Sequence, residues 1–226
     1  MVLSLDWKHF INLNLAIESF PFVIQGIGYT FLISLVSMGV GLFIGFFLCL
    51  ARRSSTKFLR LPARLYISFM RGIPMLALLF ILYFGLPVFG IQLTAISSAI
   101  IGFSINCAAY IAEVQRASLN SVSKGQWDAG YAIGLSTWQT LYGIIIPQAA
   151  RIAIPSLLNI FLDLVKASSL AAVISVPELL FNAQIVAGRT YDSITLYLLV
   201  ALIYWVICIV ISTLTEIVEK RLSQYQ

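Results

Sequence analysis

The chain has 226 residues, of which 60% are hydrophobic and 10% are charged, and its mean hydropathy is +0.97. Soluble domains average roughly 45–50% apolar and about 25% charged residues. This composition excludes a water-soluble monomer, a disordered chain, a coiled coil and a collagen-like protein, and it predicts a protein embedded in a membrane. Cys49, Cys107 and Cys208 lie in apolar runs without metal-ligand spacing, so we expect neither a disulfide framework nor a metal site.

Charge-free stretches locate the expected membrane spans, because about 20 apolar helical residues cross a bilayer core of about 30 Å. The first span is expected within residues 19–51, a stretch too long for the apolar region of a signal peptide. The others are expected at 66–84, 96–115, 152–172 and 193–215. The sequence therefore predicts an all-α polytopic membrane protein with five transmembrane helices. We expect residues 1–21 to form an extracytoplasmic or interfacial segment and 22–226 to form a single five-helix domain.

Basic residues gather at alternate ends of the expected spans. One side holds Arg52, Arg53, Lys57, Arg60, Arg64, Arg116, Lys124, Arg151, Lys220 and Arg221, and the other holds Lys8 and Arg189. The richer side is expected to face the cytoplasm, which places the N-terminus outside and the C-terminus inside. The same distribution accounts for the net charge of +5 and leaves no basic domain for nucleic acid.

Two local patterns predict the geometry of individual spans. Gly41 and Gly45 form a GxxxG pair, which favours close packing of the first span against another helix. Arg71 precedes Gly72 and Pro74, and this run predicts a break in the second span. No internal repeat is visible, which argues against a secondary transporter built from inverted repeats.

The longest polar insertion, residues 120–155, separates the third and fourth expected spans. Ser123 and Gln126 have the spacing of a capping box, which predicts a short helix beginning there. Gly134 is suited to end that helix, because glycine readily adopts the left-handed conformation that follows many helices. We therefore expect one short amphipathic helix on the cytoplasmic side.

The faces of this short helix indicate two kinds of contact. Trp127 and Tyr131 are four residues apart and share a face, while Ala129 and Gly130 are small enough for close backbone approach. One interpretation is a helix that lies on lipid headgroups or on the chain's own loops. The other is a helix that docks in a groove of another protein, with Trp127 as its anchor.

A longer spaced pattern overlaps this helix. Asp128, Ala129 and Gly130 are followed by Gly134 and then by Ile144, Ile146 and Pro147. This run resembles the EAA signature of permease subunits of ATP-binding-cassette (ABC) importers, which reads EAA, three residues, G, nine residues, I, one residue, LP. Segments at 71–74, 125–127, 147–155, 169–170 and 176–179 resemble the polar amino acid branch of that family, and those at 83–91 and 106–117 are most like cystine permeases.

The resemblance implies a type I ABC importer permease whose coupling loop, residues 119–150, docks on a separate ATPase subunit. The coupling residues that it indicates are Gly125, Gln126, Trp127, Asp128, Ala129, Gly130, Gly134 and Leu135. ATP and Mg²⁺ would be bound by that subunit, because this chain has no GxxxxGK[ST] phosphate loop. We therefore expect a chain that is no enzyme and needs no cofactor of its own.

The resemblance also implies the other partners and the location. The expected assembly is a dimer with a second copy or a sister permease, surrounded by lipid of the cytoplasmic (inner) membrane of a prokaryote and served by an extracytoplasmic substrate-binding protein. The substrate would be a polar amino acid, with L-cystine indicated by the branch. The alternative is an ion-coupled secondary amino acid transporter. A membrane enzyme is disfavoured, because the sequence has one histidine, His9, and no paired carboxylates or metal ligands.

Ionisable side chains inside a span are costly in lipid, which makes them candidates for a substrate site. Asp163 lies about 17 Å along the fourth span, near the bilayer midplane, and Lys166 follows on the same face. The two could form a self-sufficient ion pair, or they could offer charges of both signs to a zwitterionic amino acid. The full set of candidate substrate-binding residues is Asp163, Lys166, Ser168, Ser169, Asn106 and Tyr110.

Overall fold

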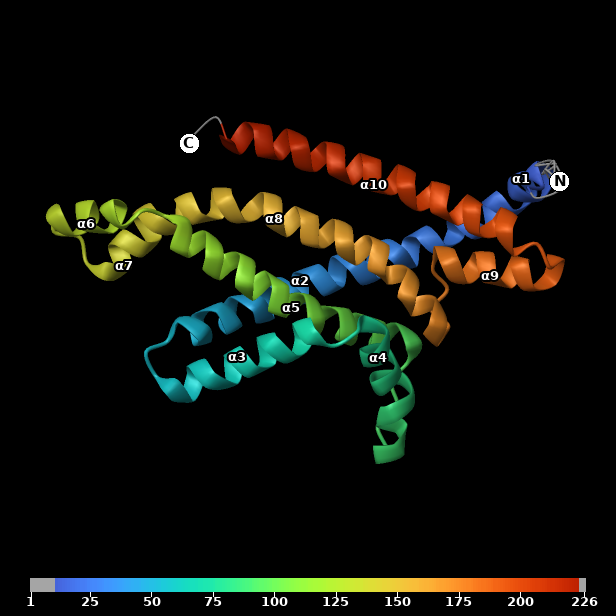
Figure 1. Cartoon of the computed structure of the whole chain (residues 1–226), viewed down its shortest axis with the longest axis horizontal. Helices are drawn as coiled ribbons and strands as arrows, with labels where there is room; N and C mark the ends of the chain where they lie inside the picture. The colour runs from blue at the N-terminus through green and yellow to red at the C-terminus, as the bar shows by residue number, and fades with distance from the viewer. Residues whose placement is uncertain (1–10, 224–226) are drawn as a thin grey trace, which may run out of the picture.

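The computed structural model describes residues 11–223 and, over that range, consists of helices and their connections without strands. Residues 1–10, with Lys8 and His9, and residues 224–226 lie outside it. The helices are α1 (Leu13–Val23), α2 (Ile27–Arg53), α3 (Lys57–Gly72), α4 (Met75–Phe80), α5 (Ala95–Ser121), α6 (Lys124–Ala132), α7 (Thr137–Thr140), α8 (Ile146–Ala167), α9 (Leu179–Thr190) and α10 (Ser193–Ser223). Short 3₁₀ and π turns extend them at Ile24–Gly26, Ile81–Gly85, Leu86–Phe89, Leu141–Ile145 and Ser168–Ile174. The predicted all-α fold class is confirmed (Figure 1).

Four helical stretches of the described chain are long and apolar enough to cross a membrane. They are Leu13–Arg53, Ala95–Ser121, Thr137–Ile174 and Ser193–Leu222, and they contain the first, third, fourth and fifth predicted spans. The first is longer than expected, because a 3₁₀ turn joins α1 and α2 into one helix of 41 residues. The expected division of the chain after residue 21 therefore falls inside a helix, since Pro21 is accommodated within α1.

The second predicted span is broken. Helix α3 and the helical segment over residues 75–89 meet at an angle of 104°, so a fifth span exists if this bent pair is counted as one. Pro74 has no N–H with which to continue the hydrogen bonds of α3. The break expected after Arg71 is confirmed, and residues 66–84 form two helical pieces rather than one straight helix.

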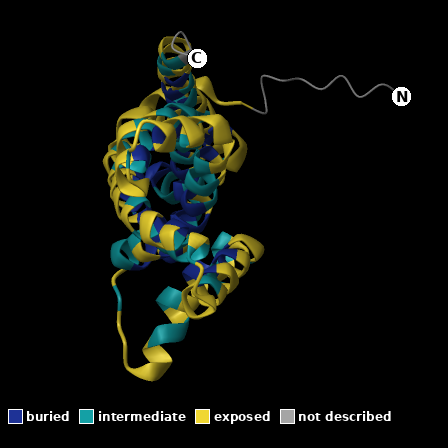
Figure 2. Ribbon diagram, turned by 90° about the vertical axis from the view of Figure 1, so that its left-hand side faces the viewer, coloured by how far each residue is buried: buried dark blue, intermediate teal, exposed yellow. Residues whose placement is uncertain are grey.

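One part of the core lies where α2, α5 and α8 cross, and another joins α9 and α10 to α8 and to the end of α1. A Cβ added to Gly41 would lie 2.3 Å from Cys107 Sγ, and one on Gly45 would lie 2.8 Å from a methyl carbon of Ile111. The close packing predicted from the GxxxG pair is therefore confirmed, with α5 as its partner. Figure 2 looks along the molecule and shows the buried residues gathered between the helices, with exposed residues around them. Many of the exposed side chains are large and apolar, such as Trp205, and suit contact with lipid.

The elongated molecule has two distinct ends (Figure 1). The turn between α2 and α3 and the α6–α7 loop lie at one end, toward which α10 also runs, and α1 and α9 lie at the other. Arg52 and Arg53 occupy the last turn of α2 at the first end, and Arg189 occupies the last turn of α9 at the second. The basic residues that the sequence assigns to opposite sides thus lie at opposite ends of the molecule. Which end faces the cytoplasm stays a prediction.

Candidate functional site

Three of the predicted substrate residues meet at one cavity. Asn106 and Tyr110 of α5 and Asp163 of α8 line a cavity of about 270 Å³. Met75, the first residue of α4 after the helix break, lines another side of it. The cavity, which we call the substrate cavity, is therefore formed by the α5–α8 pair together with the bend between α3 and α4.

Asp163 and Lys166 form the ion pair that their spacing predicts. Lys166 Nζ lies 2.7 Å from Asp163 Oδ1, and the two side chains remain 51% and 72% exposed, in that order. Both residues belong to α8, so the pair connects no second helix. Charges this exposed on a long apolar helix require water or another chain beside them, because lipid cannot solvate them. The pair therefore faces water or a partner chain rather than lipid.

Asn106 has a structural partner as well as a place in the substrate cavity. Its Nδ2 donates a hydrogen bond of 2.8 Å to the carbonyl oxygen of Met70. In an unbroken helix that carbonyl would accept from the N–H of residue 74, which is proline here. Asn106 therefore stabilises the break after α3, and its amide oxygen remains for a ligand.

The two predicted serines lie outside the substrate cavity. Ser168 is fully buried, donates to the carbonyl oxygen of Val165 at 2.8 Å and lies 3.5 Å from the Tyr204 hydroxyl of α10. Ser169 donates to the carbonyl oxygen of Lys166. The helix changes from α to 3₁₀ geometry at Ser168, so the residues that follow no longer continue the helix face that Asp163 and Lys166 share. The two serines therefore do not line the substrate cavity together with Asp163.

Helix α6 is the short helix expected in the loop, and Gly134 ends it as predicted. Gly134 has a φ of +82°, and the N–H of the next residue, Leu135, bonds to the Gly130 carbonyl at 3.1 Å. The predicted capping box at Ser123 is wrong, because its side chain caps nothing and Gln126 instead accepts a hydrogen bond from Gln148.

A capping box does form one helix later. Ser136 and Gln139 at the start of α7 have the same spacing, and each side chain bonds the other residue's backbone N–H, at 3.3 Å to Gln139 N and 2.8 Å to Ser136 N. The motif therefore fixes the entry into α7, which follows the end of α6.

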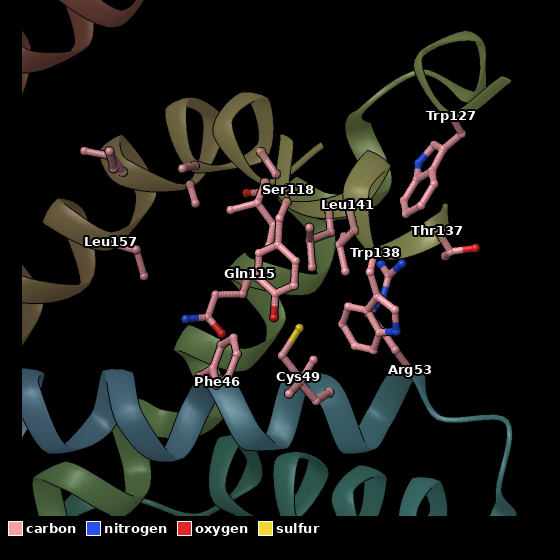
Figure 3. A pocket seen from close by; sticks show the side chains of 18 residues that line it. Phe46, Cys49, Arg53, Gln115, Ser118, Trp127, Thr137, Trp138, Leu141 and Leu157 are labelled. Carbon is pink, nitrogen blue, oxygen red and sulfur yellow. The ribbon is translucent and has the colours of Figure 1, made fainter. Parts of the chain in front are cut away.

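Trp127 points back toward the chain's own helices. It packs beside Ile145 and Ala149 and lines an apolar cavity of about 500 Å³ between α2, α5 and α8 (Figure 3). Leu157 of α8 lines the same cavity, and Ile160, about one turn further along α8, lines the substrate cavity. Trp127 thus lines a cavity that lies about one turn of α8 from the substrate cavity.

The opposite side of α6 is the one that another protein can reach. Gly130 is buried, because Thr140 of α7 lies 2.6 Å from where its Cβ would be, so its small size serves a contact within the chain. Gly125, Asp128 and Ala129 are exposed, and they share a face because Asp128 and Ala129 follow Gly125 by three and four residues. We call Gly125, Asp128 and Ala129 the outer face of α6.

A charged cluster beside the substrate cavity was not predicted from the sequence. Glu113 of α5 pairs with Arg52 of α2, with Arg71 of α3 at 3.9 Å and with Arg116 at 3.1 Å. The Arg71 guanidinium also lies 5.5 Å from the centre of the Tyr110 ring, which lines the cavity. The spacing of Glu113 and Arg116 was the only signal in the sequence, because the other two partners come from separate helices.

Long apolar helices, a short helix on a loop at one end and a cavity lined by Asn106, Tyr110 and Asp163 together define a multi-pass membrane protein with polar groups inside its bundle. Residues 37–224 match the family of the binding-protein-dependent transport system inner membrane component, and the chain belongs to that family.

Three comparisons place the chain within that family. It is 57% identical over 225 residues, 100% of each chain, to the probable amino-acid ABC transporter permease protein YckA of Bacillus subtilis (strain 168). It is 42% identical over 214 residues, 94% of this chain and 92% of the relative, to the L-cystine transport system permease protein TcyB of the same organism. A crystal structure of an amino acid ABC transporter with histidines has a chain that superposes on this one with a TM-score of 0.90 and 31% identity. The match covers 93% of this chain and 99% of that chain. The predicted resemblance and the importer permease fold are confirmed, and the chain is a transport subunit rather than an enzyme.

Proposed function

We propose that the chain is the membrane-spanning permease of an ABC importer that carries a polar amino acid, with L-cystine as the first candidate, into the cytoplasm. Family membership and the cystine permease among the relatives support this proposal. The observation that carries it is the exposed Asp163–Lys166 ion pair, whose Asp163 lines the substrate cavity. Charges of both signs suit the ammonium and carboxylate groups of an amino acid.

The proposed assembly places two permease chains, identical or sisters, around the pathway. The N-terminus of each permease chain lies outside and its C-terminus inside. A substrate-binding protein delivers the amino acid from the outer side. ATP and Mg²⁺ are bound by separate ATPase subunits at the cytoplasmic end. The basic residues at the end that carries α6 support this orientation.

The coupling residues have two roles in this proposal. The outer face of α6 contacts the ATPase, while Trp127 transmits the movement of α6 to α8 through the apolar cavity (Figure 3). Gly134 and Leu135 fix the end of α6 and hence its angle to α7. We therefore expect Trp127→Ala to leave ATP hydrolysis in place and to lower the uptake per ATP about tenfold, because the contact between α6 and the groove is lost.

Uptake and hydrolysis measured together on the purified complex in proteoliposomes test this coupling role. Trp205→Ala is the matched control, because Trp205 is 61% exposed on α10 and far along the chain from the loop. An unchanged ratio of uptake to hydrolysis in Trp127→Ala would contradict the role.

The transport proposal itself is tested by uptake of labelled L-cystine, arginine, glutamine, glutamate and histidine in cells with and without this chain. We expect loss of one activity that depends on ATP and persists when the ion gradient is collapsed. Loss that follows the ion gradient instead would favour the secondary transporter.

A further inference from the structure

Helix α3 presents three chemically different faces. Ala63, Ile67 and Met70 are buried against the rest of the bundle. Phe58, Leu61, Leu65 and Phe69 are large, apolar and exposed. Lys57, Arg60, Arg64 and Arg71 recur at spacings of three, four and seven residues, and they share the remaining face. A helix of this kind borders the core, the lipid and a third, polar environment.

The polar environment is a hollow with unbalanced positive charge. Arg64 and Arg71 of α3 and Arg52 of α2 line a hollow of about 430 Å³, which we call the arginine hollow. Glu113 is the acidic partner of Arg52 and Arg71, and it is shared with Arg116. Within the described residues, Arg64 has no hydrogen bond or ion pair. One carboxylate therefore faces several guanidinium groups, and the hollow attracts anions.

The arginine hollow adjoins the substrate cavity. Arg71 lines the hollow and its guanidinium lies 5.5 Å from the centre of the Tyr110 ring, while Tyr110 lines the cavity. These two side chains are in direct contact across the α3–α5 boundary, so the hollow and the cavity are neighbours.

The depth of Arg71 distinguishes between two possible anions. Helix α3 runs back from the turn that follows α2 (Figure 1), and Arg71 lies about 21 Å along it from Lys57. Arg71 is therefore the arginine of the hollow that lies farthest from this turn, on the side of the substrate cavity. A lipid phosphate stays near the membrane surface, whereas a transported anion passes through the core. A carboxylate in the pathway therefore fits the hollow better than a headgroup does.

We propose that the arginine hollow is a carboxylate-binding step on the inner side of the substrate cavity, which receives the α-carboxylate of the amino acid before its release. This inference rests on the proposed function. Arg64, which has no partner among the residues that the structure describes, supplies the attraction, and Arg71 contacts Tyr110 at the border of the cavity. Glu113 neutralises part of the charge, so that the carboxylate is held weakly enough to leave.

The test uses the complete complex in proteoliposomes, with MgATP enclosed on the side of the ATPase subunits. We expect Arg64→Gln to lower the maximal rate of L-cystine uptake about fivefold with the half-saturating concentration unchanged, since the outer side selects the substrate. Arg64→Lys should keep most of the rate. Arg221→Gln is the matched control, because Arg221 is an exposed arginine in the last turn of α10 and does not line the hollow. Sodium sulfate enclosed at the ionic strength of a chloride control should slow wild type and not Arg64→Gln.

Each contrary result identifies a different error. Wild-type uptake and unchanged sulfate inhibition in Arg64→Gln would overturn the carboxylate step. Loss of assembly on size-exclusion chromatography would overturn it in favour of a contact between subunits. A dependence of wild-type uptake on phosphatidylglycerol that disappears in Arg64→Gln would overturn it in favour of a lipid phosphate.

Failure of the proposed function is a separate result, because then wild type takes up no amino acid with ATP. In that case, thiol labelling of Ser68→Cys in the complex tests the hollow, because Ser68 lines it and this change keeps Arg64. An anionic methanethiosulfonate that reacts faster than a cationic one, and is slowed by sulfate, supports an anion site. The reverse order of rates overturns it.

Discussion

Asp163 and Glu178 are two acidic residues that flank the end of the α8 helical stretch, and they have opposite surroundings. The Asp163 side chain is 72% exposed and pairs with Lys166 on its own helix. Glu178 is fully buried and accepts hydrogen bonds from Phe181 N at 2.8 Å and from the Tyr204 hydroxyl at 2.7 Å. The comparison indicates that Asp163, paired only with its own neighbour, is open to a ligand, whereas Glu178 is enclosed by contacts between separate helices.

The buried acid connects three parts of the bundle. Glu178 caps α9 through Phe181 and reaches α10 through Tyr204. Its backbone also meets the turn between α1 and α2, where a Cβ on Gly26 would lie 2.4 Å from the Glu178 carbonyl carbon. Burial raises the pKa of the Glu178 carboxyl, and hydrogen bonds from the backbone and from Tyr204 oppose that rise.

The largest expected effect is that of Glu178→Ala. This change leaves the Tyr204 hydroxyl and the first N–H groups of α9 without their acceptor in a buried place, at a cost of about 3 kcal/mol. We expect a marked loss of folded permease, measured as the amount recovered and its thermal unfolding in detergent. Glu178→Gln should retain more, because its amide oxygen can still accept. Equal recovery of Glu178→Ala and wild type would show that the buried acid does not stabilise the bundle.

Asp163→Asn should affect transport and leave assembly intact. Neutralising the acid leaves Lys166 without its partner at the substrate cavity, and we expect uptake to fall about tenfold with normal recovery of the complex. Glu216→Gln is the matched control, because Glu216 is an exposed acid on α10. Asp163→Glu should restore part of the uptake. Parallel loss of assembly and uptake would place Asp163 with Glu178 as a structural residue.

Features of local origin could be predicted from the sequence. The apolar stretches predicted the spans, and the GxxxG pair of Gly41 and Gly45 predicted a close helix contact. Pro74 indicated the break in the second span. Gly134 gave the end of α6. Each of these features depends on the chemistry of a few residues that are neighbours in the sequence, so the sequence alone can predict it.

Features that depend on contacts between distant segments could not be predicted. The direction of Trp127 is set by the α2, α5 and α8 groove, and the pairing of Glu113 with Arg52 and Arg71 is set by three helices. Ser168 turns away from Asp163 because the helix changes to 3₁₀ winding in the folded bundle. The sequence therefore predicted the ion pair of Asp163 with Lys166, but not the cluster of Glu113 with its arginines. The binding of substrate by these residues stays a prediction.

The smallest expected effect sharpens the comparison at the hydroxyl of Tyr204. Tyr204→Phe removes one hydrogen bond to Glu178 and a 3.5 Å contact with Ser168 while it keeps the ring. The expected loss is about 1 kcal/mol in the free energy of unfolding, with transport by the remaining folded complex unchanged. Tyr197→Phe on the same helix is the control, because Tyr197 is 44% exposed. Thermal unfolding and uptake normalised to folded complex measure the two parts. A fall in normalised uptake for Tyr204→Phe would mean that the buried network takes part in transport, and the distinction between the two acids would then fail.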